Sequence, residues 1–273
     1  MTESTMSVRN RMEAVSLAAE RLAQAARTGV PCGPVRDLLG DTDVELAYAV
    51  QQRLIQGRVG DGARIVGRKI GLTSPAVQQQ IGVDRPDFGV LLDDMDVSAL
   101  PEVPSDRLLQ PKAEAEIAFV LGTDLADGPL DQAQVRNAVD HAVGALEIVD
   151  SRVAGWDIRI TDTVADNASS GLYVLGPEGR ILDDFEPRDA VMHLYVDDEL
   201  ASQGDGTACL GDPLVALAWL ARTAREYGEP LRSGQVVLSG ALGAMVPARP
   251  GSTIRAELSG LGSVTTTFSQ KGT

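Results

Sequence analysis

Apolar residues recur every three to four positions in the first part of the chain, which is the spacing of one face of a helix. This pattern runs over residues 7–29 and again over residues 42–60. Thr42 or Asp43 can cap the second helix, because their side-chain oxygens accept hydrogen bonds from the free amides of a first turn. Residues 1–60 are therefore predicted to form a helical N-terminal section.

From residue 61 onward the pattern changes to short apolar runs separated by glycine-rich turns, which is typical of β-strands. Strands are predicted at 64–72, 115–122, 144–150, 171–176, 191–198, 235–240 and 252–269, and helices at 131–143 and 212–228. Asp212 is the expected N-cap of the last helix. Because helices and strands do not alternate regularly, we expect a mixed, largely antiparallel sheet rather than a doubly wound parallel one. The predicted fold class is α+β.

The charge of the chain limits its partners. The 273 residues carry a formal net charge of -15, with a sequence pI near 4.5. Nucleic acids and anionic membranes would be repelled, so neither is an expected partner, and an anionic ligand would need local positive charge. No apolar run approaches the roughly 20 residues of a membrane span. Two distant cysteines, Cys32 and Cys209, and an N-terminus without the apolar core of a signal peptide favour a cytoplasmic protein, with one disulfide left open.

Two glutamates stand two residues apart in a segment that otherwise is typical of a buried strand. Since side chains alternate between the faces of a strand, Glu114 and Glu116 point to the same face, about 6–7 Å apart at their bases. Glu147 lies in a second apolar strand. Like charges on a partly buried face are costly unless one is protonated or a cation lies between them. Three carboxylates converging from two strands would form an all-oxygen site that suits Mg²⁺ or Mn²⁺ better than Zn²⁺.

A plainer interpretation of these charges stays open. The face with Glu114 and Glu116 could be exposed to solvent, with Glu147 paired to an arginine. Arg68 and Lys69, beside a glycine turn, could simply be solvated. The charge balance favours a role for Lys69, because three carboxylates and one divalent cation still sum to one negative charge, and an anionic substrate needs more positive charge. Partial burial is then expected to lower the pKa of Lys69 toward the range of acid–base catalysis.

Two polar segments carry further candidates. Asp87 lies in a predicted polar loop at 82–91 and is not marked as catalytic by its sequence alone. Asn167, Ser169 and Ser170 follow a short predicted helix, where hydrogen bonds to the local backbone are the default explanation.

Other chemistries lack their motifs. The sequence has no nucleophile elbow, P-loop, dinucleotide-binding glycine motif, paired-cysteine motif or HExxH zinc motif. Its two histidines, His141 in a predicted helix and His193 in a predicted strand, are expected to be structural or surface residues. A serine hydrolase is therefore not expected, nor is a cofactor beyond a metal ion.

Four segments are distinctive when taken together. They are GRKIGLTSPAVQQQIGVDRPDFGVLLDDM, QPKAEAEIAFVLGTDL, ALEIVDSRVAGWDIRITDTVADNASSG and GEPLRSGQVVLSGALGAMVPARPG. In order and spacing they resemble the 2-keto-4-pentenoate hydratases (2-hydroxypenta-2,4-dienoate hydratases) of the fumarylacetoacetase-like superfamily. The resemblance runs from about residue 40 to the C-terminus. It implies a homo-oligomer in which a helical section at 1–60 precedes a catalytic domain at 61–273, built on a rolled β-sheet of the fumarylacetoacetase C-terminal type.

The resemblance also implies roles for individual residues. A divalent metal ion, Mg²⁺ or Mn²⁺, would be held by Glu114, Glu116 and Glu147. The family's active-site lysine falls on Lys69 and its loop acid on Asp87. The substrate, a small anionic 2-oxo or 2-hydroxy acid, would be bound by Arg68, Asn167, Ser169 and Ser170, with Ser169 favoured for its carboxylate.

The implied reaction is metal-dependent addition of water to a 2-hydroxy-2,4-dienoate, or its 2-oxo-4-enoate tautomer, giving a 4-hydroxy-2-oxo acid. The Gly-Arg-Lys run at 67–69 is similar to that of the hydratases, whereas related decarboxylases tend to carry Gly-Leu-Lys. Lys112 and Asp212 stand where arginine and histidine are frequent, which puts the substrate range in doubt. The alternatives are a 4-oxalocrotonate-type decarboxylase of a 2-oxo-3-enedioate, an acylpyruvate hydrolase, and a non-catalytic partner subunit of such an enzyme.

Overall fold

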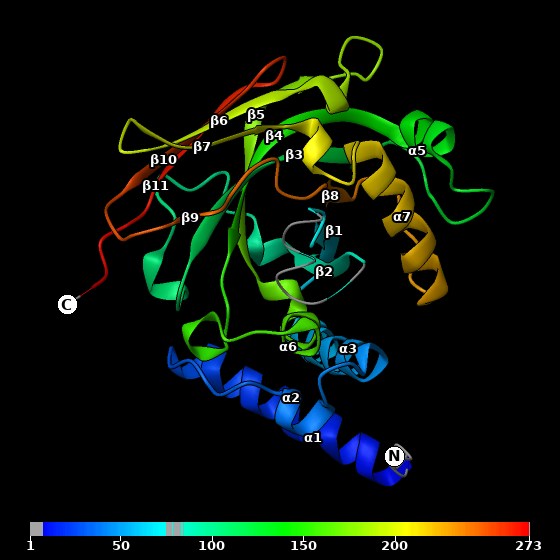
Figure 1. Ribbon diagram of the computed structural model, residues 1–273, viewed down its shortest axis with the longest axis vertical. Helices are drawn as coiled ribbons and strands as arrows, with labels where there is room; N and C mark the ends of the chain where they lie inside the picture. Colours follow the sequence, from blue (N-terminus) through cyan, green and yellow to red (C-terminus); the bar gives the residue numbers. More distant parts are fainter. Residues whose placement is uncertain (1–7, 75–77, 79–82, 84, 273) are drawn as a thin grey trace.

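Four helices lie together at one end of the molecule (Figure 1). The computed structural model describes residues 8–74, 78, 83 and 85–272. The helices are α1 (Val8–Thr28), α2 (Arg36–Leu39), α3 (Val44–Gly60) and, from much later in the chain, α6 (Ile160–Ala165). The Asp43 carboxylate accepts a hydrogen bond from Leu46 N at 3.0 Å and caps α3. The two long N-terminal helices, α1 and α3, were predicted and are confirmed.

A seven-stranded sheet forms the centre of the molecule. Its strands follow the order β2-β1-β8-β3-β4-β5, and β9 pairs with β3. Their bounds are β1 Ile65–Gly71, β2 Asp87–Leu92, β3 Lys112–Leu121, β4 Val139–Val149, β5 Ser170–Arg180, β8 Val236–Leu238 and β9 Val246–Pro247. Only β1 and β8 run parallel among these pairs, so the expected mixed, largely antiparallel sheet is confirmed.

A second sheet covers β4 and β5 of the first (Figure 1). It has the order β11-β10-β6-β7, with β6 Val191–Val196, β7 Glu199–Asp205, β10 Thr253–Leu258 and β11 Gly262–Thr267. On another side α7 (Pro213–Glu226) packs against α5 (Gln132–Ala138). The short 3₁₀ helices are η1 Asp93–Met95, η2 Ser105–Arg107, η3 Ala154–Trp156, η4 Asn167–Ser169, η5 Pro187–Asp189 and η6 Gly206–Ala208.

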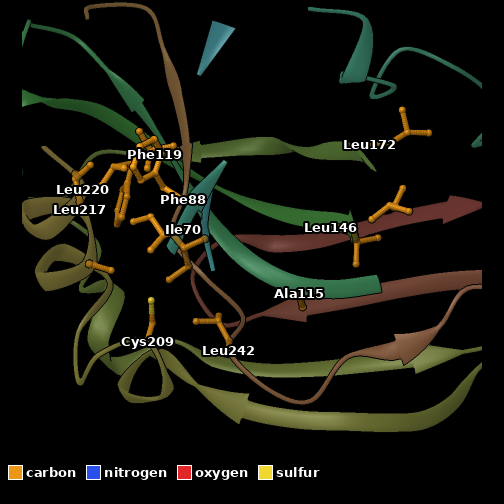
Figure 2. Close-up of a cluster of buried hydrophobic side chains, with 14 of the residues drawn as sticks. Ile70, Phe88, Ala115, Phe119, Leu146, Leu172, Cys209, Leu217, Leu220 and Leu242 are labelled. Carbon is orange, nitrogen blue, oxygen red and sulfur yellow. The ribbon is translucent and has the colours of Figure 1, made fainter. Parts of the chain in front are cut away.

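Apolar side chains from helices and sheets meet in one large core. Figure 2 shows Leu217 and Leu220 of α7 close to Phe119 of β3, and all three are fully buried. The side chains of Ile70 and Phe88, from β1 and β2, join the same cluster. The core therefore fixes β1, β2 and β3 relative to one another, and these strands carry most of the candidate site residues.

Two expectations about local structure are wrong. His141 lies in β4, because the helix predicted at 131–143 ends at Ala138 and the β-branched residues that follow pair with β3. Asp87 does not lie in a loop but begins β2. The strand was not predicted because Pro86 directly precedes it and Gly89 lies within it, and both residue types are frequent in loops. None of the helices in the described ranges is long and apolar enough to cross a lipid bilayer. The boundary at residue 60 stays a prediction.

Candidate active site

Three glutamates converge on one face of the large sheet. Glu114 of β3 stands directly opposite Glu147 of β4, and Glu116 follows on the same face, as strand alternation predicts. Each of the three offers a carboxylate oxygen within 4.8 Å of the others. Glu116 and Glu147 are 0 % and 1 % exposed. The alternative of a solvent-exposed face is therefore wrong for Glu116, whereas Glu114 on the same face is half-buried.

Two of the three carboxylates have oxygens without a hydrogen-bond partner in the described part of the chain. Glu116 Oε2 accepts a hydrogen bond from Gly240 N at 2.8 Å. Within the described part of the chain, Glu116 Oε1 and both oxygens of Glu147 are buried without any hydrogen bond. Buried carboxylate oxygens are normally hydrogen-bonded, paired or bound to a metal. This set of hard oxygen donors fits a divalent cation such as Mg²⁺ and lacks the nitrogen and sulfur ligands of a typical zinc site.

Gly240 has to be glycine for its amide to reach Glu116. Its φ is 112°, in a region that residues with a Cβ rarely adopt. A Cβ at this position would also lie 2.5 Å from the side chain of Thr73. The loop after β8 can therefore bring its amide close to the carboxylate only with glycine there.

Burial and mutual repulsion disfavour charge on the glutamates. The pKa of Glu114 is raised to about 7 by burial and by the charge of Glu147. Burial, with the charges of Glu147 and Glu114, likewise raises the pKa of Glu116 well above its ordinary value. The cluster therefore holds negative charge at a cost that a cation would relieve.

Lys69 of β1 is the buried cation nearest to these acids. Its Nζ lies 3.1 Å from Glu147 Oε1, an ion pair with an exposed fraction of 4 % for Lys69 and 2 % for Glu147. Burial alone would lower the pKa of Lys69, but the surrounding carboxylates, Glu147 and Asp87 first among them, outweigh burial and raise it. The expectation of a lowered pKa is therefore wrong for this arrangement. The partner of Glu147 is this lysine and not an arginine.

Asp87 shares the face of Lys69 on the neighbouring strand. The pairing of Lys69 with Gly89, two residues beyond Asp87, puts both side chains on one side of the β1–β2 pair. Asp87 is 1 % exposed, and its Oδ2 accepts a 3.4 Å hydrogen bond from the hydroxyl of Thr163. Burial raises the pKa of Asp87 to about 6, against the opposing effect of Lys69. Asp87 therefore titrates close to neutral pH.

The segment 167–169 crosses β2 in an unusual backbone conformation. Asn167, Ala168 and Ser169 have φ values of 55°, 51° and 53°, all in the left-handed region that costs energy for residues with a Cβ. The Asn167 side chain accepts a hydrogen bond from Val90 N at 2.7 Å and donates one to Val90 O at 2.9 Å. Asn167 therefore ties this turn to β2.

Only one of the three polar side chains in this turn faces Asp87. Ser170 Oγ donates to Asn167 O at 2.7 Å, so Asn167 and Ser170 both support the turn itself. Ser169 Oγ lies 3.4 Å from Thr163 Oγ1, the hydroxyl that bonds Asp87. The structure thus brings Ser169 to the acidic site, whereas the substrate contacts of Asn167 and Ser170 remain predictions without such a contact.

The structure does not bring Arg68 to the site. Its neighbour in the register is Val90, and its side chain lies on the opposite face of β1 from Lys69. Arg68 Nη2 donates to Glu229 Oε2 at 2.7 Å. A direct contact of Arg68 with a substrate held at the glutamates has no support in this geometry.

The two departures from the family pattern have local roles. Lys112 Nζ lies 4.3 Å from the ring centroid of Trp156, a cation–π contact. Asp212 caps α7 by accepting from Leu214 N at 2.8 Å, and it also bonds the side chain of Gln132. Lys112 also shares the face of Glu114 on β3, and its charge opposes the rise in the pKa of that carboxyl.

Thr163 was missed by the sequence interpretation. It lies six residues before Ser169 in the same polar segment, and its helix α6 points its hydroxyl at Asp87. Thr163 and Ser169 are hydroxyl residues separated by the end of α6 and a tight turn. This spacing was the signal in the sequence that could have identified Thr163 as a site residue.

Comparisons with known proteins agree with this fold. Residues 90–269 match the family model described as the fumarylacetoacetate (FAA) hydrolase C-terminal family. The TodF product hydratase of Pseudomonas putida (strain F1) is 53% identical over 95% of this chain and 97% of its own. The 2-keto-4-pentenoate hydratase of Paraburkholderia xenovorans (strain LB400) is 51% identical over 92% of this chain and 93% of its own.

A solved structure extends the likeness to the helical section. The 4-oxalocrotonate decarboxylase from Pseudomonas putida G7, in complex with magnesium and adipate, superimposes with a TM-score of 0.89 at 32% identity, covering 97% of this chain and 100% of the decarboxylase. The chain belongs to the fumarylacetoacetate hydrolase family, and within it to the branch of the 2-keto-4-pentenoate hydratases.

Proposed function

We propose that the protein is a hydro-lyase that adds water to a 2-hydroxy-2,4-dienoate, which can also be written as its 2-oxo-4-enoate tautomer, and forms a 4-hydroxy-2-oxo acid. The observation that carries this proposal is the cluster of three glutamates, in which Glu116 Oε1 and Glu147 Oε2 have no partner among the described residues and Lys69 lies beside Glu147. The hydratases to which the chain is similar support the choice of reaction.

Glu114, Glu116 and Glu147 are proposed to hold a divalent cation, Mg²⁺ or Mn²⁺. When bound, such a cation acts as a Lewis acid toward an oxygen-rich anionic substrate. The similar decarboxylase structure in complex with magnesium supports a divalent cation as the bound ion. The choice between Mg²⁺ and Mn²⁺ is part of the proposal.

Lys69 and Asp87 are proposed to handle charge and protons. With its raised pKa, Lys69 is an ammonium at neutral pH, so it can balance the charge of an anionic substrate or donate a proton. Asp87, with a pKa of about 6, is mostly ionised at neutral pH and can accept a proton from water or from the dienol. Ser169 Oγ is proposed to bind the substrate carboxylate.

A spectroscopic assay tests the proposal. Loss of the ultraviolet absorbance of 2-hydroxypenta-2,4-dienoate is followed with wild type, Lys69→Ala and a control, Lys271→Ala, which removes an amine far from the cluster in the sequence. We expect turnover that depends on a divalent cation in wild type and control, and a loss of at least about 100-fold in Lys69→Ala. A wild type that leaves the dienoate unchanged would refute the hydratase.

A decarboxylase is the second candidate, because the decarboxylase from Pseudomonas putida G7 shares the fold over almost the whole chain. Release of CO₂ from a 2-oxo-3-enedioate, measured against hydration of the monocarboxylate, separates the two reactions. A non-catalytic partner subunit would show neither reaction alone. A cytoplasmic homo-oligomer is also proposed, and light scattering of the purified protein checks the oligomer.

A further inference from the structure

A buried glutamine of the N-terminal section connects the two sides of the Asp87–Thr163 pair. Gln51 lies on α3 and is 3 % exposed. Its Nε2 donates to Phe88 O at 3.0 Å and to Val164 O at 3.0 Å. Phe88 directly follows Asp87 in β2, and Val164 directly follows Thr163 in α6. We propose that Gln51 is a positioning residue that sets the distance between Asp87 and Thr163, and this inference rests on the function proposed above.

The placement of β2 explains why such a support is needed. β2 is the last strand in the order of the large sheet, so one edge of its backbone has no neighbouring strand among the described residues. At Phe88 the side chains of α3 take the place of that strand. The Tyr48 hydroxyl accepts from Phe88 N at 3.2 Å, while Gln51 binds Phe88 O. Both polar backbone groups of Phe88 are therefore held by side chains of α3.

Only a side chain with two N–H donors can satisfy both carbonyls. The amide of Gln51 supplies two such hydrogens from one nitrogen, and both acceptors are backbone groups of elements that carry site residues. The Asp87–Thr163 bond is already long at 3.4 Å, so a small shift of β2 against α6 would break it. Displacements of about 1 Å at a catalytic group can reduce turnover strongly.

The supporting residues lie outside the part of the chain that the family model covers. The match begins at residue 90, after both Gln51 and Asp87. The large sheet supplies the glutamates from within the matched region, whereas α3 supplies the support for Asp87. The N-terminal helical section thus contributes to the proposed active site by supporting the strand that carries Asp87.

A double-mutant cycle tests the inference. Gln51→Met keeps the length of the side chain but removes both donors, and Tyr48→Phe removes a single hydroxyl in case the first variant folds poorly. Gln52→Met makes the same change on the exposed neighbour in α3. For each variant kcat and KM are measured with and without Asp87→Asn, together with hydrogen exchange of the segments 87–92 and 160–165.

We expect Gln51→Met to lower kcat about tenfold with KM changed less than about twofold, and to cause no further loss when Asp87 is already asparagine. Tyr48→Phe should show the same pattern at smaller size, and exchange in 87–92 should become faster in both variants. Gln52→Met should behave as wild type. Equal losses with and without Asp87→Asn would show a merely structural role and overturn the inference alone, as would unchanged kcat in Gln51→Met. An inactive wild type would overturn the proposed function, and the inference with it.

Discussion

Two groups of buried acids have opposite environments. The first group, called the seam, lies where α6 and its C-cap Asp166 meet α2 and Arg152. Asp162 of the seam is completely buried and accepts four hydrogen bonds, from Val35 N, Arg36 N, Arg36 Nη1 and Arg159 N. At the proposed active site, Glu116 is equally buried but accepts one, from Gly240 N, within the described chain. The carboxylate of Asp162 therefore stabilises the fold, whereas Glu116 Oε1 has no hydrogen bond in the described chain and is available to bind a cation.

The pKa values do not separate the two groups. Asp166 at the seam is bonded to Arg152, yet burial raises its pKa to about 6, as it does for Asp87 at the site. What differs is the satisfaction of the oxygens. A buried acid with a shifted pKa is therefore a weaker sign of a functional site than a buried acid without partners.

Removal of one glutamate should have the largest effect on activity. Glu116→Gln keeps the volume of the side chain but removes a negative charge, so we expect turnover of the dienoate to fall by about 10³-fold, equivalent to several kcal/mol of charge stabilisation. Without added divalent cation, its thermal unfolding temperature should equal or exceed that of wild type, because a repulsive buried charge is gone. A clear loss of stability would mean that the site acids support the fold as the seam acids do.

The matched change at the seam should have the reverse effect. Asp162→Asn weakens the charge-assisted hydrogen bonds that join α2 to α6, and we expect a loss of about 3 kcal/mol in the free energy of unfolding. Denaturant titration measures it. Turnover per folded molecule should stay within about threefold of wild type, and a much larger drop would contradict the separation of the two groups.

Divalent cations should stabilise the wild type through the glutamates alone. At about 100 times its dissociation constant, a ligand specific for the folded state adds about 2.7 kcal/mol. We expect Mg²⁺ to raise the unfolding temperature of wild type and of Asp162→Asn after treatment with EDTA. Glu116→Gln should show little response, and a normal response there would place the cation elsewhere.

The smallest effect should come from the titration of Asp87. Because its pKa rises from an ordinary 3.8 to about 6 on folding, the folded state binds more protons than the unfolded state between these pH values. In the presence of EDTA, stability should therefore fall as pH increases from about 4 to 6. Asp87→Asn should remove part of this slope, as measured by unfolding temperature against pH, and an unchanged slope would contradict the assigned shift.

Much of the site followed from local sequence patterns. Strand alternation correctly placed Glu114 and Glu116 on one face, and α1 (Val8–Thr28) and α3 (Val44–Gly60) lie where helices were expected. The same alternation could have shown that Arg68 and Lys69 point to opposite faces. Asp87 was misplaced because Pro86 and Gly89 give a strand the appearance of a loop.

The sequence by itself determined the amphipathic helices, the alternating strands and the presence of three acids in apolar surroundings, because these depend on neighbours a few residues apart. Only the tertiary structure decided that Glu114 faces Glu147, that Lys69 lies 3.1 Å from Glu147 and that Gln51 supports β2. Such contacts depend on strand register and on helix packing between segments far apart in the chain, and a register shift of one residue would turn each side chain to the other face.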